Sequence, residues 1–488
     1  MPRPSLRVWL LAIPVLYFLY FFGLTNVGLL GPDEPRYAAI GREMAHSGDW
    51  ITPRLWGEPW FEKPALLYWM TGAAFQLGLS EDLAPRLPVA AISVVFLLFF
   101  YWALQREFGQ AAAVYATAVL ATSDGWLSLS HIGVTDLPMS AAFSAAMLLS
   151  LGWLERGERQ WLPAAAALLG IAMLAKGLVP LVLAVPLACM GWRRLLDWFR
   201  PQVAGAFAIV ALPWYVACYL RNGRPFLEKF FWEHQVERFR TSELAHGQPF
   251  WFLVPVLIAA LFPWIPALVP LARRSLYSDA RRRFLLIWVL FGLAFFSASA
   301  NKLPGYVMPL VPALAALAGI ALAEYQGARW VLAATTALLA FVGPITAILP
   351  DALSAGILRS HLPPFHWTWL LPLVAAGVVW YLDRAGQRAA AMALLVVAIT
   401  VGLVSLERRS FPAIDLAASA RPLWTAVAPI LDRVCVARLH RSLRYGLNYY
   451  SVTPLPDCHS EPREIEITQD PGSAPRLVSA VAVPASLQ

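Results

Sequence analysis

The stretch from Val8 to Leu30 reads VWLLAIPVLYFLYFFGLTNVGLL, and it runs without a break into Gly31-Pro32-Asp33-Glu34. An apolar run of this length, preceded by Arg3 and Arg7, is long enough to cross a membrane. A secretory signal peptide would be shorter and would end in small residues before a cleavage site. We therefore expect an uncleaved first span, with its two arginines on the cytoplasmic side.

The composition of the whole chain also indicates a membrane protein. Of its 488 residues, 59% are hydrophobic and only 14% are charged, whereas a soluble globular chain carries about 25% charged residues. A soluble multidomain enzyme is therefore excluded. The formal charge is +8, but the basic residues lie in short loops between apolar runs, as is typical of cytoplasmic loops. The charge thus indicates orientation in the membrane and gives no reason to expect a nucleic-acid partner.

Arginine clusters alternate along the chain with loops that are poor in uncompensated basic charge. The clusters expected on the cytoplasmic side are Arg106, then Arg156 and Arg159, then Arg193, Arg194 and Arg200, then Arg273 to Arg283, then Arg329, and lastly Arg384 and Arg388. Because both flanks of the segment from Trp161 to Gly191 are Arg-rich, we expect two short helices there that turn near Lys176-Gly177. In total we expect about thirteen transmembrane helices, at roughly twenty residues each.

The pattern predicts an all-α polytopic membrane domain over residues 1–406. Its first outer loop, residues 31–82, should hold an amphipathic helix from Arg36 to His46, stopped by Ser47-Gly48. The apolar segment from Ala65 to Leu79 is too short to span, so we expect it to lie on the outer membrane surface.

Residues 407–488 have mixed charge and no long apolar run, which predicts a small soluble α/β domain in the periplasm of a double-membrane bacterium. We expect short strands at Val434–Val436 and Tyr449–Val452 around a helix near Arg438–Gly446. Cys435 and Cys458 would lie in this oxidising compartment, where either a disulfide or two free thiols are compatible with the sequence.

Several ionisable residues fall in loops on the expected outer side. Asp33 and Glu34 could simply favour the N-terminus of the following helix by capping and through its dipole. The others are Asp136, Lys176, His234, Arg238 and Lys302, and each alone could be a solvated charge or a helix cap. Together, cations beside carboxylates at one membrane surface suit an anionic lipid headgroup, because Lys and Arg bind phosphate. The chain has no Walker or Rossmann glycine pattern, so we expect a lipid phosphate as substrate and no nucleotide.

Five motifs resemble, in order and spacing, the bacterial transferases that move 4-amino-4-deoxy-L-arabinose from undecaprenyl phosphate to lipid A. These belong to the GT-C superfamily and are related to protein O-mannosyltransferases. The motifs are Asp33-Glu34-x-Arg36-Tyr37-Ala38, Phe61-Glu62-Lys63-Pro64, Lys176-Gly177, Phe231-Trp232-Glu233-His234 through Pro249-Phe250-Trp251, and Lys302-Leu303-Pro304-x-Tyr306.

The resemblance implies a role for each matching residue. It implies Asp33 as the catalytic carboxylate, Asp136 as a second catalytic aspartate, Lys63, Arg238, Lys302 and Tyr306 around the donor phosphate, and Glu62 with His234 as ligands of a divalent metal, zinc or magnesium. Lys176, in or near the outer interface, is a further candidate for binding the lipid phosphate, because ionisable groups there are functional candidates by default.

The resulting hypothesis is a monomeric multi-pass glycosyltransferase of the bacterial inner membrane. It would transfer a sugar, aminoarabinose or a similar one, from undecaprenyl phosphate to lipid A or to another glycan or protein at the periplasmic face, by an inverting displacement. Protein or polysaccharide acceptors are alternatives within the same enzyme class. A lipid or sugar transporter and a structural assembly factor are alternatives outside it, although the chain shows no repeat of the Asp-Glu segment of the kind that transporters often carry.

Overall fold

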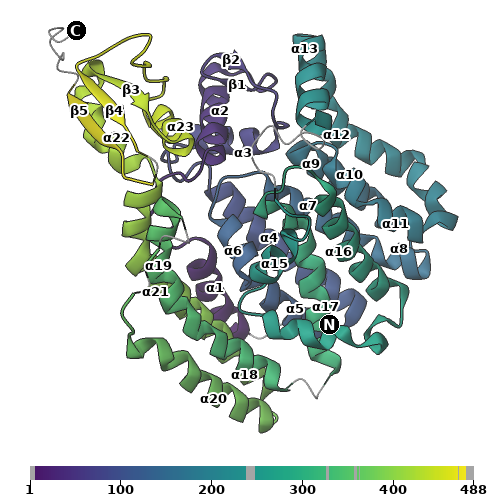
Figure 1. Ribbon diagram of the computed structural model, residues 1–488. Coiled ribbons are helices and arrows are strands. Elements are labelled where there is room, and N and C mark those ends of the chain that lie inside the picture. Colours follow the sequence, from purple (N-terminus) through teal and green to yellow (C-terminus); the bar gives the residue numbers. More distant parts are fainter. Residues whose placement is uncertain are drawn as a thin grey trace.

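The computed structural model describes residues 6–237, 248–325, 329–356, 360–361, 363–470 and 472–479, and most of them are helical (Figure 1). The α-helices are α1 (Leu6–Tyr20), α2 (Asp33–Ser47), α3 (Leu66–Gln76), α4 (Leu87–Phe108), α5 (Gln110–Ala121), α6 (Asp124–Ser130), α7 (Asp136–Leu149), α8 (Leu151–Arg156), α9 (Leu162–Lys176), α10 (Val179–Leu183), α11 (Val185–Met190), α12 (Pro201–Asn222), α13 (Arg224–Leu227), α15 (Leu253–Ala260), α16 (Ala280–Ala298), α17 (Val311–Glu324), α18 (Arg329–Leu338), α19 (Val342–Ala355), α20 (Leu371–Arg384), α21 (Arg388–Ala418), α22 (Arg421–Val427) and α23 (Arg441–Tyr450).

Short 3-10 helices and five strands complete the described structure. The 3-10 helices are Trp192–Phe199, Ile265–Ala272, Arg274–Tyr277, Pro304–Leu310, Leu339–Phe341, Trp367–Leu370 and Ala428–Arg433, and a π-helix spans Glu228–Glu237. The strands are β1 (Arg54–Leu55), β2 (Glu58–Pro59), β3 (Val434–Arg438), β4 (Ile465–Thr468) and β5 (Arg476–Ser479). The expected class, a helical membrane body with a small α/β domain at its C-terminal end, is confirmed.

Six helices among the described residues are long and apolar enough to cross a membrane, or seven if one bent pair counts as a span. They are Leu87–Phe108, Asp136–Arg156, Pro201–Asn222, Pro304–Glu324, Arg329–Leu353 and Arg388–Ala418, and the bent pair is Leu253–Ala260 with Ile265–Ala272. Shorter apolar helices lie between them, so the larger total of about thirteen stays a prediction. The expected turn after Lys176 is confirmed, because α9 ends there and Gly177 has a φ of 72°.

The first helix is shorter than the apolar run that predicts it. α1 ends at Tyr20, and Gly23 follows with a φ of 74°, a backbone conformation that an L side chain rarely adopts. The residues up to Leu30 therefore form turns that lead into α2.

The loops that carry the arginine clusters converge at one end of the helical body. Glu107, at the end of α4, accepts hydrogen bonds from Arg156 at 2.8 Å and from Arg281 at 3.2 Å. Arg106 pairs with Glu158 in the same region. Three loops that the charge pattern assigns to one side therefore meet in a single ion-pair network.

The helix α2 lies at the opposite end, beside the C-terminal domain (Figure 1). It begins at Asp33, ends at Ser47 and is closed by Gly48, whose N–H donates to Met44 O. It crosses α3 so closely that a Cβ on Gly41 would lie 2.7 Å from Thr71 Cβ. Most of α2 is buried, whereas an interfacial amphipathic helix would expose its polar side. The physical reason is that α23 of the C-terminal domain covers that side.

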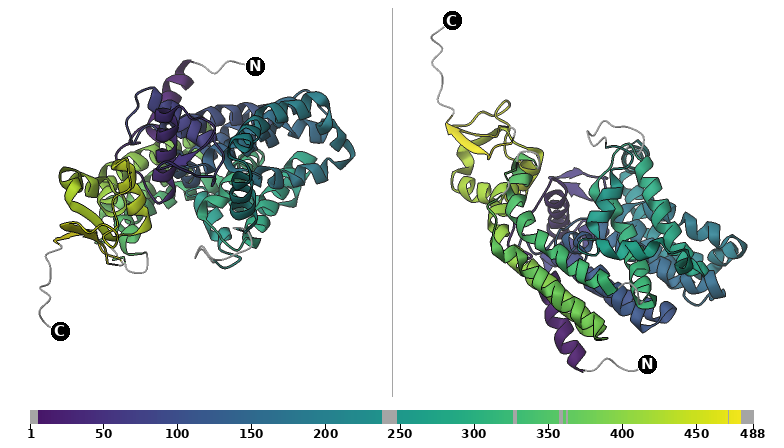
Figure 2. Two further views of the ribbon diagram at one scale, coloured as in Figure 1. Left: turned by 90° about the horizontal axis from the view of Figure 1, so that it is seen from above. Right: turned by 60° about the horizontal axis from the view of Figure 1, so that its bottom comes forward.

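The C-terminal domain consists of α22, α23 and a three-stranded sheet in the order β3-β4-β5, in which β3 is parallel to β4 and β4 antiparallel to β5. Helix α21 runs unbroken past residues 406 and 407, so the chain leaves the helical body at Ala418. Figure 2 shows this domain at the end of the molecule remote from the start of α1.

The expected strand at Tyr449–Val452 is wrong, because Tyr449 and Tyr450 form the end of α23. Their rings are buried and anchor the domain to the first loop. The hydroxyl of Tyr449 donates to Glu81 O at 2.9 Å, and that of Tyr450 donates to Asp82 Oδ1 at 2.6 Å. Aromatic residues that the sequence pattern assigns to a strand thus serve as docking residues.

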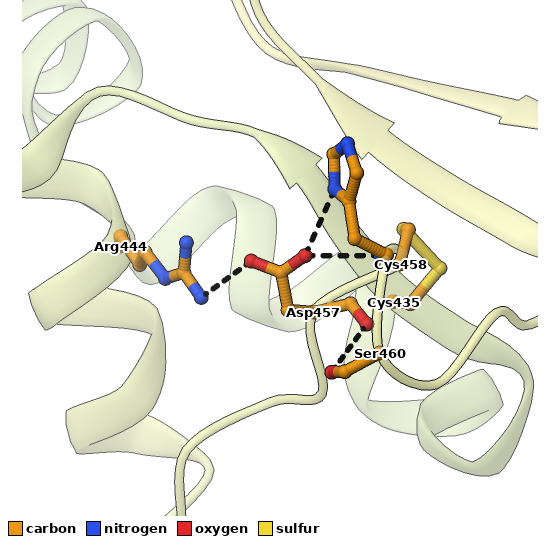
Figure 3. The surroundings of a disulfide bond; sticks show 6 residues. Cys435, Arg444, Asp457, Cys458 and Ser460 are labelled. Carbon is orange, nitrogen blue, oxygen red and sulfur yellow. Dashed lines mark hydrogen bonds and ion pairs between the residues drawn. A yellow bond between two sulfur atoms is a disulfide. The ribbon is translucent and has the colours of Figure 1, made fainter.

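A disulfide joins Cys435 of β3 to Cys458, so the alternative of two free thiols is wrong (Figure 3). Beside it, Asp457 accepts hydrogen bonds from Arg444 of α23 and from the backbone N–H of His459. These contacts hold the pKa of Asp457 below its usual value, with the His459 backbone hydrogen bond as the largest cause. The disulfide and this carboxylate together tie the loop after α23 to the sheet.

Candidate active site

Glu34 is the buried residue around which the candidate site is built. It is 0% exposed and receives two hydrogen bonds from the guanidinium of Arg86, at 2.7 and 2.8 Å. Its two oxygens also accept the backbone N–H groups of Leu30, at 2.7 Å, and Gly133, at 2.8 Å. Because Gly133 lies three residues before Asp136, Glu34 ties the loop of Asp33 to the loop of the second aspartate.

Asp33, next to Glu34, is 40% exposed and forms an ion pair with Arg36 one helical turn away. Pro32 precedes it as the N-cap, and no side chain caps this helix, so capping does not explain the two carboxylates. Arg36 is only 4% exposed and donates to Glu62 Oε2 at 2.8 Å. Lys63 lies 3.1 Å from Glu62 Oε1. Asp33, Arg36, Glu62 and Lys63 are therefore brought into one cluster, which we call the Asp33 cluster.

Aromatic rings surround the guanidinium of this cluster. The Arg36 Cζ lies 5.0 Å from the ring centre of Tyr445 and 5.7 Å from that of Trp60. Burial tends to lower the pKa of Arg36, but the charges of Glu62 and Asp33 outweigh it and raise the pKa above its ordinary value. Arg36 therefore stays charged and fixes the orientation of both carboxylates. Tyr445 belongs to α23, so the C-terminal domain contributes directly to this cluster.

A buried apolar cluster holds the segment Phe61-Glu62-Lys63-Pro64 in place. Phe61 is 4% exposed, and its ring lies 5.3 Å from that of Phe226, which packs at 5.6 Å against Trp214 of α12. The same cluster includes Met173 and Leu174 near the end of α9. The charged residues of this segment are thus presented from a rigid apolar base.

Asp136, Lys176 and Tyr306 form a second group, which we call the Asp136 cluster. Lys176 Nζ donates to Asp136 Oδ1 at 2.6 Å and lies 5.3 Å from the ring centre of Tyr306. Gly305 makes the approach possible, because a Cβ there would lie 2.8 Å from Asp136 Oδ1. Residues from α7, α9 and the segment before α17 therefore meet at the head of three helices.

Lys302 lies beside this group in the chain but is held by backbone carbonyls. Its ammonium donates to Ser299 O at 2.7 Å and to Gln248 O at 3.0 Å, and the side chain is only 7% exposed. An ammonium has three donors, so two of them fix the hairpin between α16 and α17.

The metal site that the resemblance implies, Glu62 with His234, lies only partly within the described residues. The backbone of His234 lies in the π-helix Glu228–Glu237, but its side chain and all of Arg238 fall outside the described residues. Within the part of the chain that is described, no group of three or more His, Cys, Asp or Glu side chains could hold a metal ion. Glu62 already contacts two cations, Arg36 and Lys63, which oppose the approach of a third positive charge.

Sequence reasoning missed the structural importance of Glu34, Arg86, Arg36 and Tyr445. Arg36 belongs to the motif that begins at Asp33, and its spacing from Asp33 by one helical turn indicates an ion pair. Arg86 precedes an apolar span and has no charged neighbour in the next turn. Nothing in the sequence indicates that Arg86 pairs with Glu34, or that Tyr445 contacts Arg36.

Comparison with known proteins gives three results. Residues 62–216 match the family model described as dolichyl-phosphate-mannose-protein mannosyltransferase. The undecaprenyl phosphate-alpha-4-amino-4-deoxy-L-arabinose arabinosyl transferase of Pseudomonas aeruginosa (strain UCBPP-PA14) is 34% identical over 334 residues, which are 65% of this chain and 60% of that protein. The transferase of the same name from Pectobacterium carotovorum is 32% identical over 363 residues, 70% of this chain and 64% of that protein.

The third comparison concerns solved structures. The crystal structure of ArnT from Cupriavidus metallidurans bound to undecaprenyl phosphate superimposes with a TM-score of 0.77 and 23% identity, covering 99% of this chain and 100% of that one. The crystal structure of the same protein in its apo state superimposes with a TM-score of 0.75 and 24% identity, covering 95% of this chain and 93% of that one. The aligned part of the chain spans about 60% of the length of the first curated relative. The chain therefore has the fold of ArnT, and the resemblance that its motifs predict is confirmed as sequence similarity to the curated aminoarabinose transferases.

Proposed function

We propose that this chain is a membrane-embedded glycosyltransferase that moves aminoarabinose from undecaprenyl phosphate to lipid A. The observation that carries the proposal is the Asp33 cluster, in which one partly exposed carboxylate and one lysine lie on either side of a buried Arg36–Glu62 pair. The names of the curated relatives and the fold shared with a structure bound to undecaprenyl phosphate support the choice of donor.

The reaction would be a single displacement at the anomeric carbon of the sugar. A new bond forms from the acceptor oxygen to that carbon, the bond from the carbon to the phosphate oxygen breaks, and its electron pair stays on undecaprenyl phosphate. Negative charge grows on the phosphate, and Lys63 would stabilise it electrostatically without protonating it. One carboxylate without a covalent partner predicts inversion at this carbon, by analogy with inverting glycosidases.

Asp33 would orient the acceptor and accept its proton, and Arg36 would keep the carboxylate aimed at the substrate. This role matters most for an acceptor hydroxyl, because a phosphate acceptor is already ionised at neutral pH. The Asp136 cluster would position the hairpin that carries Tyr306, whose hydroxyl could donate to the departing phosphate. Lys302 would fix that hairpin and offer its remaining donor, and Arg238 would be a further phosphate contact.

We propose that the N-terminus is cytoplasmic and that the C-terminal domain faces the periplasm. The convergence of the arginine loops at one end, with the Asp33 cluster and the C-terminal domain at the other, supports this orientation. A divalent cation at Glu62 and His234 is a separate proposal that the mechanism does not use. It would require Lys63 to leave Glu62, and metal analysis of the purified wild-type protein and of His234→Ala tests it.

The experiment is mass spectrometry of lipid A and of total glycoconjugates from cells with and without the gene. The proposal expects a pentosamine added to lipid A only when the gene is present. The match to a protein mannosyltransferase model over residues 62–216 favours a protein hydroxyl as the second candidate acceptor. A sugar found on proteins and absent from lipid A would support that second candidate, and no gene-dependent sugar on either would overturn both.

A further inference from the structure

A groove of about 430 Å³ lies between α2, the turn that joins β1 to β2, and the segment after α23. Its lining includes Arg42, Glu43 and His46 of α2, Trp56 of the turn, and Val452 and Thr453 of the C-terminal domain. Cavities that bind small ligands have volumes of roughly 300–1,000 Å³. The groove belongs to neither the Asp33 cluster nor the Asp136 cluster, and none of the roles proposed above uses it.

The backbone is strained on both sides of this groove. Trp56 has a φ of 55° and Val452 a φ of 68°, and they are the two non-glycine residues with positive φ in the part of the chain that is described. A bulky or β-branched residue in this region is a genuine outlier, and such outliers cluster at ligand-binding sites because function maintains them. Both outliers line the same groove, one from the first loop and one from the C-terminal domain.

Trp56 is also unusual in its polar contacts. Its indole N–H is shielded from solvent and has no hydrogen-bond partner among the described residues, a cost that an apolar residue would avoid. Its ring stacks on that of Tyr445, with ring centres 5.8 Å apart and planes 12° from parallel. Tyr445 in turn lies against Arg36, which holds Asp33. A chain of contacts through Trp56, Tyr445 and Arg36 therefore connects the groove to the proposed catalytic carboxylate.

We propose that this groove is a subsite for the phosphorylated amino-sugar headgroup of the acceptor. The apolar face of a pyranose packs on an aromatic ring such as Trp56, the guanidinium of Arg42 suits a phosphate, and the Glu43 carboxylate that also lines the groove suits an ammonium or a hydroxyl. Arg42 is 6% exposed, donates to Tyr449 O at 2.6 Å and pairs with Glu81 at 3.4 Å, so its guanidinium has a fixed position at the groove. The choice of headgroup rests on the proposed function. In this assignment the groove holds the acceptor, and Lys63 binds the phosphate of the donor.

The test is direct binding, measured by saturation-transfer NMR on the purified full-length protein without any donor. The probes are the acyl-free glucosamine disaccharide bisphosphate and, separately, inorganic phosphate. Thr453→Trp fills the groove from an exposed position, and Trp56→Phe keeps a ring but removes the indole N–H. Leu477→Trp, on exposed strand β5, is the matched control for adding an indole to the same domain.

Wild type and Leu477→Trp should bind the disaccharide alike, and Thr453→Trp should weaken binding by about tenfold or more, the change expected when a stacking surface is blocked. Trp56→Phe should weaken disaccharide binding less than Thr453→Trp does, because the phenyl ring still offers a stacking surface. Equal binding by wild type and Thr453→Trp would overturn the subsite. Complete displacement of the disaccharide by inorganic phosphate would also overturn the subsite, because the groove would then bind any small anion. Groove-dependent binding by a protein that transfers no sugar would refute the proposed function and leave the subsite standing.

Discussion

Replacing Glu34 with Gln removes one charge from the most enclosed ion pair of the candidate site while keeping the shape of the side chain. Glu34 is 0% exposed and Arg86 3% exposed, so the guanidinium cannot turn to solvent for a new partner. Three backbone carbonyls, of Leu24, Val27 and Gly28, still accept from Arg86 in the variant. They satisfy its donors but do not neutralise its charge.

The expected loss of stability follows from these contacts. Removing one partner of a buried ion pair costs about 3–5 kcal/mol, because the other charge is left buried. The amide of Gln would also place a donor against the N–H of Leu30 or Gly133, and an unsatisfied buried donor costs about 1–3 kcal/mol. Because the three carbonyls still bind the guanidinium, the loss from the broken ion pair should lie at the low end of its range. We therefore expect a total loss of stability of about 4 kcal/mol. Glu43→Gln is the matched control in the same helix. Glu43 accepts the Gly57 N–H, so its loss should be about 1 kcal/mol or less.

The assay is unfolding in mixed micelles with increasing SDS, followed by circular dichroism. Adding Arg86→Met to Glu34→Gln removes the stranded charge, so the double variant should lose less stability than the two single variants together. A Glu34→Gln protein within about 1 kcal/mol of wild type, or strictly additive losses, would refute the idea that this pair holds the first loop.

Three further predictions concern single residues. Lys63→Ala should lower kcat/KM for the lipid-linked donor by about tenfold to a hundredfold and leave the KM for the acceptor unchanged, because a charged hydrogen bond contributes about 1.5–3 kcal/mol; an equal rise in the KM of both substrates would argue against a donor contact. Gly305→Ala should displace Asp136 and lower kcat, whereas Gly205→Ala, where an added Cβ meets nothing within 4 Å, should behave as wild type; full activity of Gly305→Ala would contradict the close approach. Cys458→Ser should destabilise the C-terminal domain by about 3 kcal/mol, since the disulfide closes a loop with a sequence separation of 23; a thermal unfolding curve identical to that of wild type would show that the disulfide contributes nothing.

Periodicity and charge predict the parts of this fold that depend on local sequence. The turn at Gly177, the stop at Gly48 and the convergence of the arginine loops follow from helix-ending residues and from the positions of basic residues. The strand expected at Tyr449 fails because an aromatic pair favours a strand in isolation, whereas here the pair anchors a helix to a distant loop.

The candidate site was predictable only in part. Motif spacing indicated Asp33, Glu62 and Lys63, and the structure brings these three together through Arg36. The contact of Tyr445 with Arg36 joins residues from opposite ends of the chain. No local pattern encodes such a contact, because it depends on how the C-terminal domain packs on α2.

The central claim is that Asp33 acts on the acceptor in a sugar transfer from undecaprenyl phosphate to lipid A. The most direct measurement uses purified protein in liposomes with synthetic undecaprenyl-phosphate aminoarabinose and lipid A, comparing wild type with Asp33→Asn. We expect the wild type to form the modified lipid A with inverted anomeric configuration, and Asp33→Asn to keep the wild-type unfolding curve while its turnover falls at least about a thousandfold. Normal turnover by the Asn variant, or product with retained configuration, would contradict the account.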